Sequence, residues 1–417
     1  MKIASVTCTP LAAKAPRAVE FSIGTFPTFY AAVVQIRTDD GLAGAGECIV
    51  RRAPEVVTTI VDRLLAPLVI GRDPWDVEGL WDEMLALLRR WGHSRGFVLE
   101  AMSGIDTALW DVLARAAGVP LYKFLGGAGR ERVRCYISKV YFDDIPRMAA
   151  EARAQVARGF SQVKVQLGWP ASRGGDRTDV ETARAVRAAV GPGVALMFDA
   201  NGAYDVGTAV RVGRQIEELD VTWLEEPVPA DDLDGYAHLR RSVRVPLAAG
   251  ETEFGLFGFR DLIARGCVDV LQPEVARIGG ITPARRLGAL AHAHNLAYAP
   301  HTGFSGGVAH LASLHLAAAA PNFFTYEYMG TQYVENPLRE IFTAPFPVPR
   351  EGMIALPGGP GLGLELDPDK LARFTVRTRP ARPAARPRRG GPYPGGCAAR
   401  AALHASHSQR LRSSGNV

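Results

Sequence analysis

The chain of 417 residues is 47% hydrophobic and 22% charged, which is typical of a globular protein with at least one large buried core. Its net charge of +5 comes from its end, because residues 377–417 contain nine arginines and no acidic residue. The rest of the chain is slightly acidic, which argues against a nucleic-acid partner. No apolar run is long enough to span a membrane, and the first sixteen residues are not expected to act as a secretory signal.

The five cysteines are odd in number, widely spaced and never arranged as C-x-x-C. This pattern disfavours both a disulfide framework and a zinc cage, and it favours a reducing compartment. We therefore expect a cytoplasmic protein with no membrane partner.

The first part of the chain predicts a mixed α+β region. An alternating segment at residues 30–38 and a turn at residues 39–41 lead into a second strand that ends near Glu47. Apolar residues at three- and four-residue steps then predict helices over residues 56–91 and 100–117.

From about residue 132, short apolar runs alternate with helical stretches, which is typical of βα units around a parallel sheet. Eight such units predict a (β/α)8-type barrel, in which functional residues gather at the carboxyl ends of the strands. The predicted strands are residues 133–139, 162–167, 194–199, 221–225, 247–251, 268–273, 296–300 and 323–327.

A titratable side chain stands at or just after the end of each predicted strand. If these positions were polar only because a solvated loop begins there, we would not expect titratable residues at all of them. These residues are Lys139, Lys164, Asp199, Glu225, Glu251, Glu274, His301 and Glu327.

Three of these residues predict a metal site. Asp199, Glu225 and Glu251 are equally spaced, one βα repeat apart, so a barrel brings them to adjacent strand ends. Converging carboxylates repel one another unless they share a hard cation, and Mg²⁺ prefers oxygen ligands. Three separate surface ion pairs are the alternative interpretation.

Two more residues predict a general base. His301 follows the seventh run and Glu274 follows the sixth. A carboxylate beside an imidazole fixes its tautomer and raises its basicity, which suits proton transfer near neutral pH. The remaining histidines have no zinc-binding spacing and are interpreted as ordinary polar residues.

These residues, with several longer motifs, resemble the enolase superfamily, specifically its mandelate racemase/muconate lactonizing enzyme-like branch of acid-sugar dehydratases and sugar-lactone cycloisomerases. The resemblance covers residues 1–376. Its motifs are GIDTALWDVLARAAGVPLYKFLGG, FDANGAY, WLEEPV, AGET, LQPEVARIGGIT, PHTGFSGG and GPGLGLEL.

The resemblance implies an α/β fold with a (β/α)7β TIM-like barrel and an N-terminal α+β capping domain. We place the capping domain at residues 1–125 and the barrel, with the active site, at residues 126–345. Residues 346–376 are expected to complete the capping domain. Residues 377–417, rich in Pro, Arg and Gly, are expected to be disordered.

The resemblance also implies a chemistry. In such proteins Mg²⁺ binds the substrate carboxylate, and a base at a strand end removes the neighbouring α-proton to form an enediolate. Asp199, Glu225 and Glu251 match the metal ligands, and Glu274 and His301 match the acid–histidine dyad. Glu274 stands where the family usually has Asp, which makes the orientation of the imidazole less certain.

A K-x-K motif of the family is only half present. Lys164 matches its first lysine, which helps to hold the carboxylate charge, and Glu327 matches an acid that hydrogen-bonds the developing enediolate oxygen. Gln166 stands where the second, catalytic lysine would be. Two-base racemisation is therefore disfavoured, and His301 remains as a single base. Gln166 is interpreted as a hydrogen-bond donor to a substrate hydroxyl, with lost activity as the alternative.

Further substrate contacts are expected around this base. Lys139 is interpreted as a partner for a second substrate carboxylate, as an unusual base or as a solvated side chain. Residues 21–29, FSIGTFPTF, lie where the family's mobile capping loop contacts the distal part of the substrate, and they offer Ser22 and Thr25. Because this segment carries no strong cation, it favours a neutral polyol or ring over a long dianion. Asn201 is another candidate contact.

The leading hypothesis is a Mg²⁺-dependent lyase that dehydrates an aldonic or aldaric acid to a 2-keto-3-deoxy product. The alternatives are a cycloisomerase or epimerase of a sugar lactone, an anhydro-sugar acid or a cyclic amino acid, and a non-catalytic pseudoenzyme. A Rossmann nucleotide site is set aside, because Gly44-Ala-Gly46 lacks the third glycine and the following helix. The expected partner is a small-molecule carboxylate, and the resemblance implies a homo-oligomer.

Overall fold

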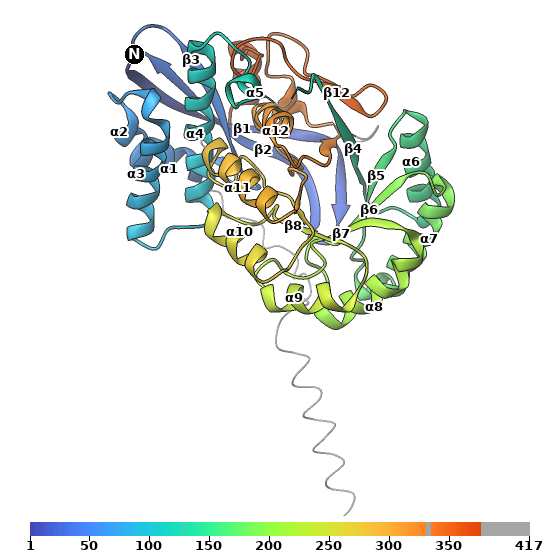
Figure 1. Cartoon of the computed structure of the whole chain (residues 1–417). Helices are drawn as coiled ribbons and strands as arrows, with labels where there is room; N and C mark the ends of the chain where they lie inside the picture. The colour runs from blue at the N-terminus through green and yellow to red at the C-terminus, as the bar shows by residue number, and fades with distance from the viewer. Residues whose placement is uncertain (128, 331–334, 377–417) are drawn as a thin grey trace, which may run out of the picture.

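The computed structural model describes residues 1–127, 129–330 and 335–376. The expected disorder after residue 376 therefore lies outside the described residues. Within them, a three-stranded antiparallel sheet with its helices stands beside a parallel barrel (Figure 1). No helix in the described part of the chain combines the length and apolar character that crossing a bilayer requires.

The capping sheet is formed by three strands in chain order, β1 (Ile3–Phe21), β2 (Gly24–Thr38) and β3 (Ala43–Ile49). β1 and β2 pair along most of their length, with Phe21 opposite Gly24 at the tip of the hairpin. The sequence analysis missed β1, because small and polar residues interrupt its alternation. Residues 21–29, which we expected to be a capping loop, are this hairpin tip and the start of β2.

The continuous helix predicted over residues 56–91 is wrong. Gly71 adopts φ 81°, and Pro74 begins a new turn after it, so the chain breaks between two helical stretches. The elements are α1 (Pro54–Ile60), a π-helical turn (Val61–Leu65), α2 (Ala66–Val69), a 3₁₀ turn (Pro74–Asp76) and α3 (Val77–Arg90).

The second predicted helix is confirmed as α4 (Phe97–Ala116), which is followed by α5 (Leu121–Phe124). α4 lies against the capping sheet without room for side chains between their backbones. A Cβ on Gly46 of β3 would lie 1.9 Å from the carbonyl oxygen of Gly104 in α4. The glycines of this segment therefore serve close packing of sheet on helix.

The predicted barrel is confirmed. Neighbouring strands pair in parallel from β4 to β10, and β11 pairs in parallel with β4. The backbone N–H of Phe324 donates to Tyr298 O across the remaining gap, which closes the ring. The strands are β4 (Arg132–Val140), β5 (Gln162–Gln166), β6 (Ala195–Asp199), β7 (Val221–Glu225), β8 (Leu247–Ala249), β9 (Val270–Leu271), β10 (Ala297–Tyr298) and β11 (Tyr326–Met329).

Seven helices connect these eight strands, so the architecture is (β/α)7β with an α+β cap. The helices are α6 (Ile145–Ala157), α7 (Asp176–Val190), α8 (Val206–Ile216), α9 (Leu233–Ser242), α10 (Gly255–Ala264), α11 (Ile281–Ala293) and α12 (Gly307–Ala319). Short 3₁₀ turns occur at Ala171–Arg173, Glu217–Leu219 and Pro337–Arg339. A buried layer of side chains from the strands fills the barrel interior: Tyr136, Met197, Trp223, Ala248, Val270 and Ala299.

The last described segment runs back to both parts of the molecule. β12 (Met353–Ala355) pairs antiparallel with β4 of the barrel. α13 (Pro368–Phe374) is followed by Val376, whose N–H donates to Pro10 O in β1. This segment therefore ties the cap to the barrel.

Candidate active site

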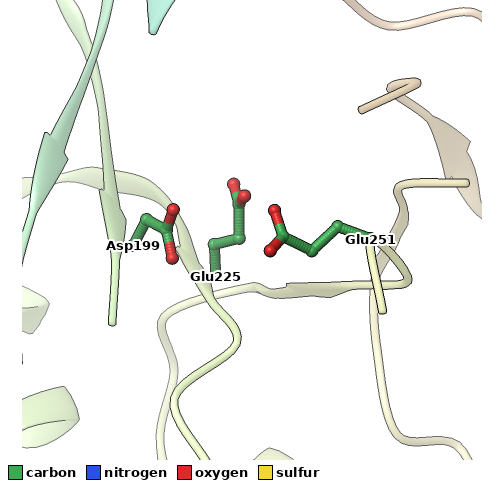
Figure 2. Close-up of side chains that lie close together, drawn as sticks. All are labelled: Asp199, Glu225 and Glu251. Atoms are coloured by element: carbon green, nitrogen blue, oxygen red, sulfur yellow. The ribbon is translucent and has the colours of Figure 1, made fainter. Parts of the chain in front are cut away.

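Three carboxylates meet at the carboxyl ends of neighbouring barrel strands. Asp199 and Glu225 end β6 and β7, and Glu251 lies just after β8. All three are buried, and one oxygen of each lies within 4.8 Å of the others. Figure 2 shows the carboxyl groups turned toward one another. The structure thus brings together the three residues that the sequence predicts as metal ligands.

The chemistry of this donor set fits Mg²⁺. Burial raises the pKa of Glu225 to about 7; Lys164 opposes that shift and Asp199 adds to it. A hard divalent cation among oxygen donors relieves such repulsion. Trp223 Nε1 and Gln272 Nε2 donate to Glu225 Oε2 at 2.9 and 2.7 Å, which fixes the orientation of this carboxylate.

Lys164 supplies a buried cation next to the three carboxylates. Its Nζ lies 2.6 Å from Glu225 Oε1 and 2.9 Å from Glu327 Oε1. Burial acts to lower the pKa of Lys164, but these two carboxylates outweigh it and hold that pKa above its usual range. Glu327 also accepts from the backbone N–H groups of Thr302 and Gly303 at 2.6 and 3.0 Å. In this arrangement Lys164 is the donor and Glu327 is an acceptor.

His301 lies between two of the glutamates. Its Nδ1 is 3.1 Å from Glu274 Oε2, which also accepts from the Ser305 hydroxyl at 2.9 Å. On the other side, His301 Nε2 lies 2.6 Å from Glu251 Oε2. Burial acts to lower the pKa of His301, but Glu251 and Glu327 outweigh this effect and raise the pKa to about 10. Although Glu replaces the usual Asp at position 274, this side chain still reaches Nδ1 of the imidazole.

Lys139 reaches the site from the end of β4. Its Nζ donates to Asp199 Oδ2 at 2.6 Å and to Asn201 Oδ1 at 2.9 Å. The ammonium group lies 5.1 Å from the centre of the Phe21 ring, and the side chain is only 5% exposed. Lys139 is therefore a buried, paired cation, and the interpretation as a solvated lysine is wrong.

Gln166 does not point into the cavity beside the carboxylates. Its Nε2 donates to Leu167 O at 2.6 Å and to Asp199 O at 3.0 Å, and it lies 3.4 Å from Ser22 Oγ. Thr25 is exposed on the hairpin, and neither Ser22 nor Thr25 lines the cavity. The amide of Gln166 thus contacts two backbone carbonyls and the hairpin, and it does not present a donor to the cavity.

The cavity over these groups measures about 60 Å³. Its charged lining includes Lys139, Lys164, His301 and Glu327, while aromatic rings come from the hairpin and from the loop after β10. The Phe21 and Phe26 rings stack at 4.8 Å, and Phe304 lies 5.3 Å from Phe26. The cap and the barrel therefore enclose the cavity together.

Sequence reasoning missed Arg51, which also lines this cavity. It follows β3 in the cap, and its Nη1 donates to Gly303 O at 3.2 Å. Two signals could have pointed to it: an arginine directly after a buried strand, and the position of that strand beside the hairpin.

A capped (β/α)7β barrel with carboxylates, a lysine and an imidazole at its strand ends defines a class of enzymes that work beneath the cap. Residues 3–126 match the family model for the mandelate racemase/muconate lactonizing enzyme N-terminal domain, and residues 147–370 match the enolase C-terminal domain-like model. The chain belongs to the enolase superfamily, in its mandelate racemase/muconate lactonizing enzyme branch.

Relatives and solved structures similar to this chain are named for three reactions: cycloisomerisation, dehydration and racemisation. The chain is 33% identical to a D-galactarolactone cycloisomerase from Agrobacterium fabrum, over 82% of this chain and 91% of the relative. It is 33% identical to an arabinonate dehydratase from Saccharolobus solfataricus, over 79% and 86%. A crystal structure of a racemase from Streptomyces coelicolor A3(2) with bound magnesium superposes with TM-score 0.81 at 29% identity, covering 90% of this chain and 100% of that one. The protein is an enzyme, a lyase or an isomerase.

Proposed function

We propose that the enzyme removes the proton α to the carboxylate of an aldonic or aldaric acid and eliminates water, giving a 2-keto-3-deoxy acid. The observation that carries this proposal is that His301 is the one imidazole among the described residues that line the cavity, while the amide of Gln166 donates to backbone carbonyls. One base suits elimination, whereas racemisation needs an acid or base on each face of the α-carbon. The dehydratase names among the relatives support the same choice.

Asp199, Glu225 and Glu251 are the residues that would hold Mg²⁺. When bound, Mg²⁺ would supply positive charge that polarises the substrate carboxyl group. The same charge would offset the negative charge of the carboxylates, which otherwise favours the protonated form of His301.

His301 carries both proton transfers in this proposal. Glu274 accepts from Nδ1–H, which leaves Nε2 to take the α-proton as the Cα–H bond breaks. The protonated Nε2 then donates to the β-hydroxyl, the C–O bond breaks and water leaves. The remaining enol becomes the 2-keto-3-deoxy acid by ketonisation.

Lys164 stabilises the negative charge that develops on the enediolate. It can donate from a buried position, where a charge-assisted hydrogen bond is stronger than in water. Burial acts to raise the pKa of Glu327, but Lys164 and His301 hold it below its usual range. In this proposal the ionised Glu327 therefore accepts from Lys164 and positions it, instead of donating to the enediolate oxygen as the resemblance implies. Lys139 and Asn201 are proposed to orient Asp199 and the substrate hydroxyls nearest to it.

Cycloisomerisation of a sugar lactone or an anhydro-sugar acid is the second candidate. It is favoured by the cycloisomerase relative, whose identity of 33% equals that of the dehydratase relative. The same base could protonate a ring oxygen as the leaving group, so the residues above would serve both reactions.

Proton NMR in D₂O with Mg²⁺ separates these possibilities. The panel contains aldonic and aldaric acids, their lactones and anhydro acids. Loss of the α-proton signal together with a 2-keto-3-deoxy product supports dehydration, and ring opening without loss of water supports the second candidate. α-Proton exchange that inverts the centre without elimination would contradict a single-base site.

His301→Asn tests the base directly. We expect turnover to fall by about 1,000-fold or more, because general acid–base catalysis contributes on that order. Titration calorimetry should show retained Mg²⁺ binding, since the three carboxylates are unchanged. His294→Asn is the matched control, because His294 is exposed at the C-terminal cap of α11. Equal activity of His301→Asn and the control would remove His301 as the base.

A further inference from the structure

We propose that Arg51 is a specificity-determining residue that binds a second carboxylate at the distal end of the substrate, so that aldaric acids are the preferred class. This inference rests on the proposed function, which leaves aldonic and aldaric acids equally open. It also reverses the expectation of a neutral distal group, which was drawn from residues 21–29 alone.

The position of Arg51 suits contact with the distal end of a ligand. It enters the cavity from the cap, whereas the acidic cluster lies at the barrel strand ends opposite the cap. The guanidinium is fixed by a hydrogen bond to Gly303 O and by a position 5.1 Å from the centre of the Phe304 ring. In this proposal, a ligand that binds its reacting carboxylate at the acidic cluster would place its other end on the cap side of the cavity, where Arg51 lies.

Arg51 differs in its ion pairing from the two lysines that line the cavity, within the described residues. Three cations line the cavity, and two of them form ion pairs: Lys139 with Asp199, and Lys164 with Glu225. Arg51 forms no ion pair with a described carboxylate.

The neighbouring Arg277 shows the contrast, because its Nε lies 3.1 Å from Glu100 Oε1. Burial lowers the pKa of Arg51, and Arg277 adds to this shift. Three carboxylates oppose the shift without forming an ion pair, so the net effect is a cost of holding the charge in this position: Glu251, Glu274 and Glu100. A carboxylate that accepts from Arg51 would offset this cost. The planar guanidinium of Arg51 can donate two parallel hydrogen bonds to one carboxylate, whereas a hydroxyl group cannot accept in this geometry.

Apart from Arg51, the described residues of the distal wall offer no positive charge to a second carboxylate. The hairpin contributes Phe21, Ile23 and Phe26 to the cavity, and none of these side chains carries a charge. A polyol end would leave the guanidinium with neutral partners only. Among the described groups of the distal wall, Arg51 is therefore the one that would distinguish aldarates from aldonates.

The test compares equilibrium binding of matched acids to the Mg²⁺-loaded full chain by titration calorimetry. The probes are galactarate with galactonate, glucarate with gluconate, and mannarate with mannonate. For the best-bound aldarate, we expect Arg51→Met to weaken binding by about 100-fold, while binding of the matching aldonate changes by less than about threefold. Arg51→Lys should give an intermediate loss, because lysine keeps the positive charge but lacks the two parallel N–H donors of the guanidinium.

Arg52→Met is the matched control, because Arg52 is exposed next to Arg51. It should leave binding of both acids unchanged. Thermal melting checks that each variant is folded. If Arg51→Met does not fold, the result of the Arg51→Lys variant decides the test. An equal loss for both acids in the Arg51 variants, no loss for either, or a wild-type protein that binds no aldarate would overturn the proposal.

Binding and turnover fail independently in this design. Aldarate binding that depends on Arg51, without any α-proton loss in D₂O, would refute the proposed function and leave this inference standing. Dehydration of aldonates without any dependence on Arg51 would refute this inference and leave the proposed function standing.

Discussion

Gln166 shows how one side chain can change the reaction open to a site without contacting the cavity. Its amide bridges two backbone carbonyls at the end of β5, next to the carboxylate cluster. A lysine in this position could reach the α-carbon from the face opposite His301, whereas the glutamine instead reinforces the strand ends. The amide of Gln166 can therefore not serve as the second base that the family's lysine would provide, and it donates to Leu167 O and Asp199 O instead.

Gln166→Leu should cost stability more than it costs chemistry. The leucine fills the same buried volume but leaves Leu167 O and Asp199 O without this donor, and losing hydrogen bonds to buried carbonyls costs about 2 kcal/mol. Urea unfolding should show this loss, with kcat lowered by less than about tenfold. A variant of full stability that loses more than about 100-fold in kcat would instead place Gln166 in contact with the substrate.

The candidate site could be predicted at the residues that end barrel strands. Asp199, Glu225 and His301 follow buried apolar runs, and the parallel topology alone brings such positions together. The direction in which Gln166 points could not be predicted, because it depends on the exact positions of nearby carbonyls. Thr25 was chosen without knowledge of the hairpin, whose register turns it to solvent.

At the scale of elements, the barrel was easier to predict than the cap. Its strands are buried on both faces and are therefore continuous apolar runs, which the sequence displays directly. β1 is long but mixed in composition, so its pairing with β2 depends on tertiary contacts. The break between α2 and α3 was also missed, because apolar spacing continues past Gly71 although the backbone does not.

Gly46→Ala tests the close approach of β3 to α4. The added methyl would lie 1.9 Å from Gly104 O, so the sheet and the helix must separate. We expect a loss of about 3 kcal/mol or more, or no folded protein, in thermal or urea unfolding. Gly79→Ala in α3 is the control, because its Cβ meets nothing within 4 Å and alanine favours a helix. A Gly46→Ala variant as stable as the control would contradict this packing.

His315 in α12 makes stability depend on pH. Tyr122 N–H donates to its Nδ1 at 3.1 Å, and its Nε2 donates to Leu362 O at 3.2 Å, so only the neutral imidazole satisfies both contacts. Burial lowers the pKa of His315 from 6.5 to about 4, with Leu362 opposing the shift. The folded state therefore binds fewer protons than the unfolded state below pH 6.5, and stability falls as pH falls from there toward 4.

His315→Leu should remove part of this pH dependence. Between about pH 7.5 and about pH 5, the histidine accounts for a loss of about 2 kcal/mol in the free energy of unfolding. The variant should be less stable than wild type at the higher pH, and its stability should fall by about 2 kcal/mol less on acidification. His294→Leu on the exposed end of α11 should keep the wild-type slope. An unchanged slope in His315→Leu would show that this histidine does not titrate as described.

For the whole molecule, the proposed chemistry is contained within residues 1–376. The acidic cluster, His301 and Arg51 all belong to the cap and the barrel, and Val376 N–H completes the contact with β1. Deleting residues 378–417 should therefore leave kcat/KM and Tm unchanged within about twofold and about 3 °C respectively. Loss of activity in the shortened chain would assign a role to the arginine-rich segment.

Sedimentation of both forms would test the predicted homo-oligomer, and cell fractionation would test the predicted cytoplasmic location.

The loop between β10 and α12 is held by the cap as well as by the barrel. Glu47 of β3 accepts from Ala309 N–H at 3.0 Å and from Gly306 N–H, and Arg51 holds Gly303 O. The short connection after the imidazole is thus anchored on one capping strand. The position of this loop, and with it that of the imidazole, therefore depends on contact between the cap and the barrel.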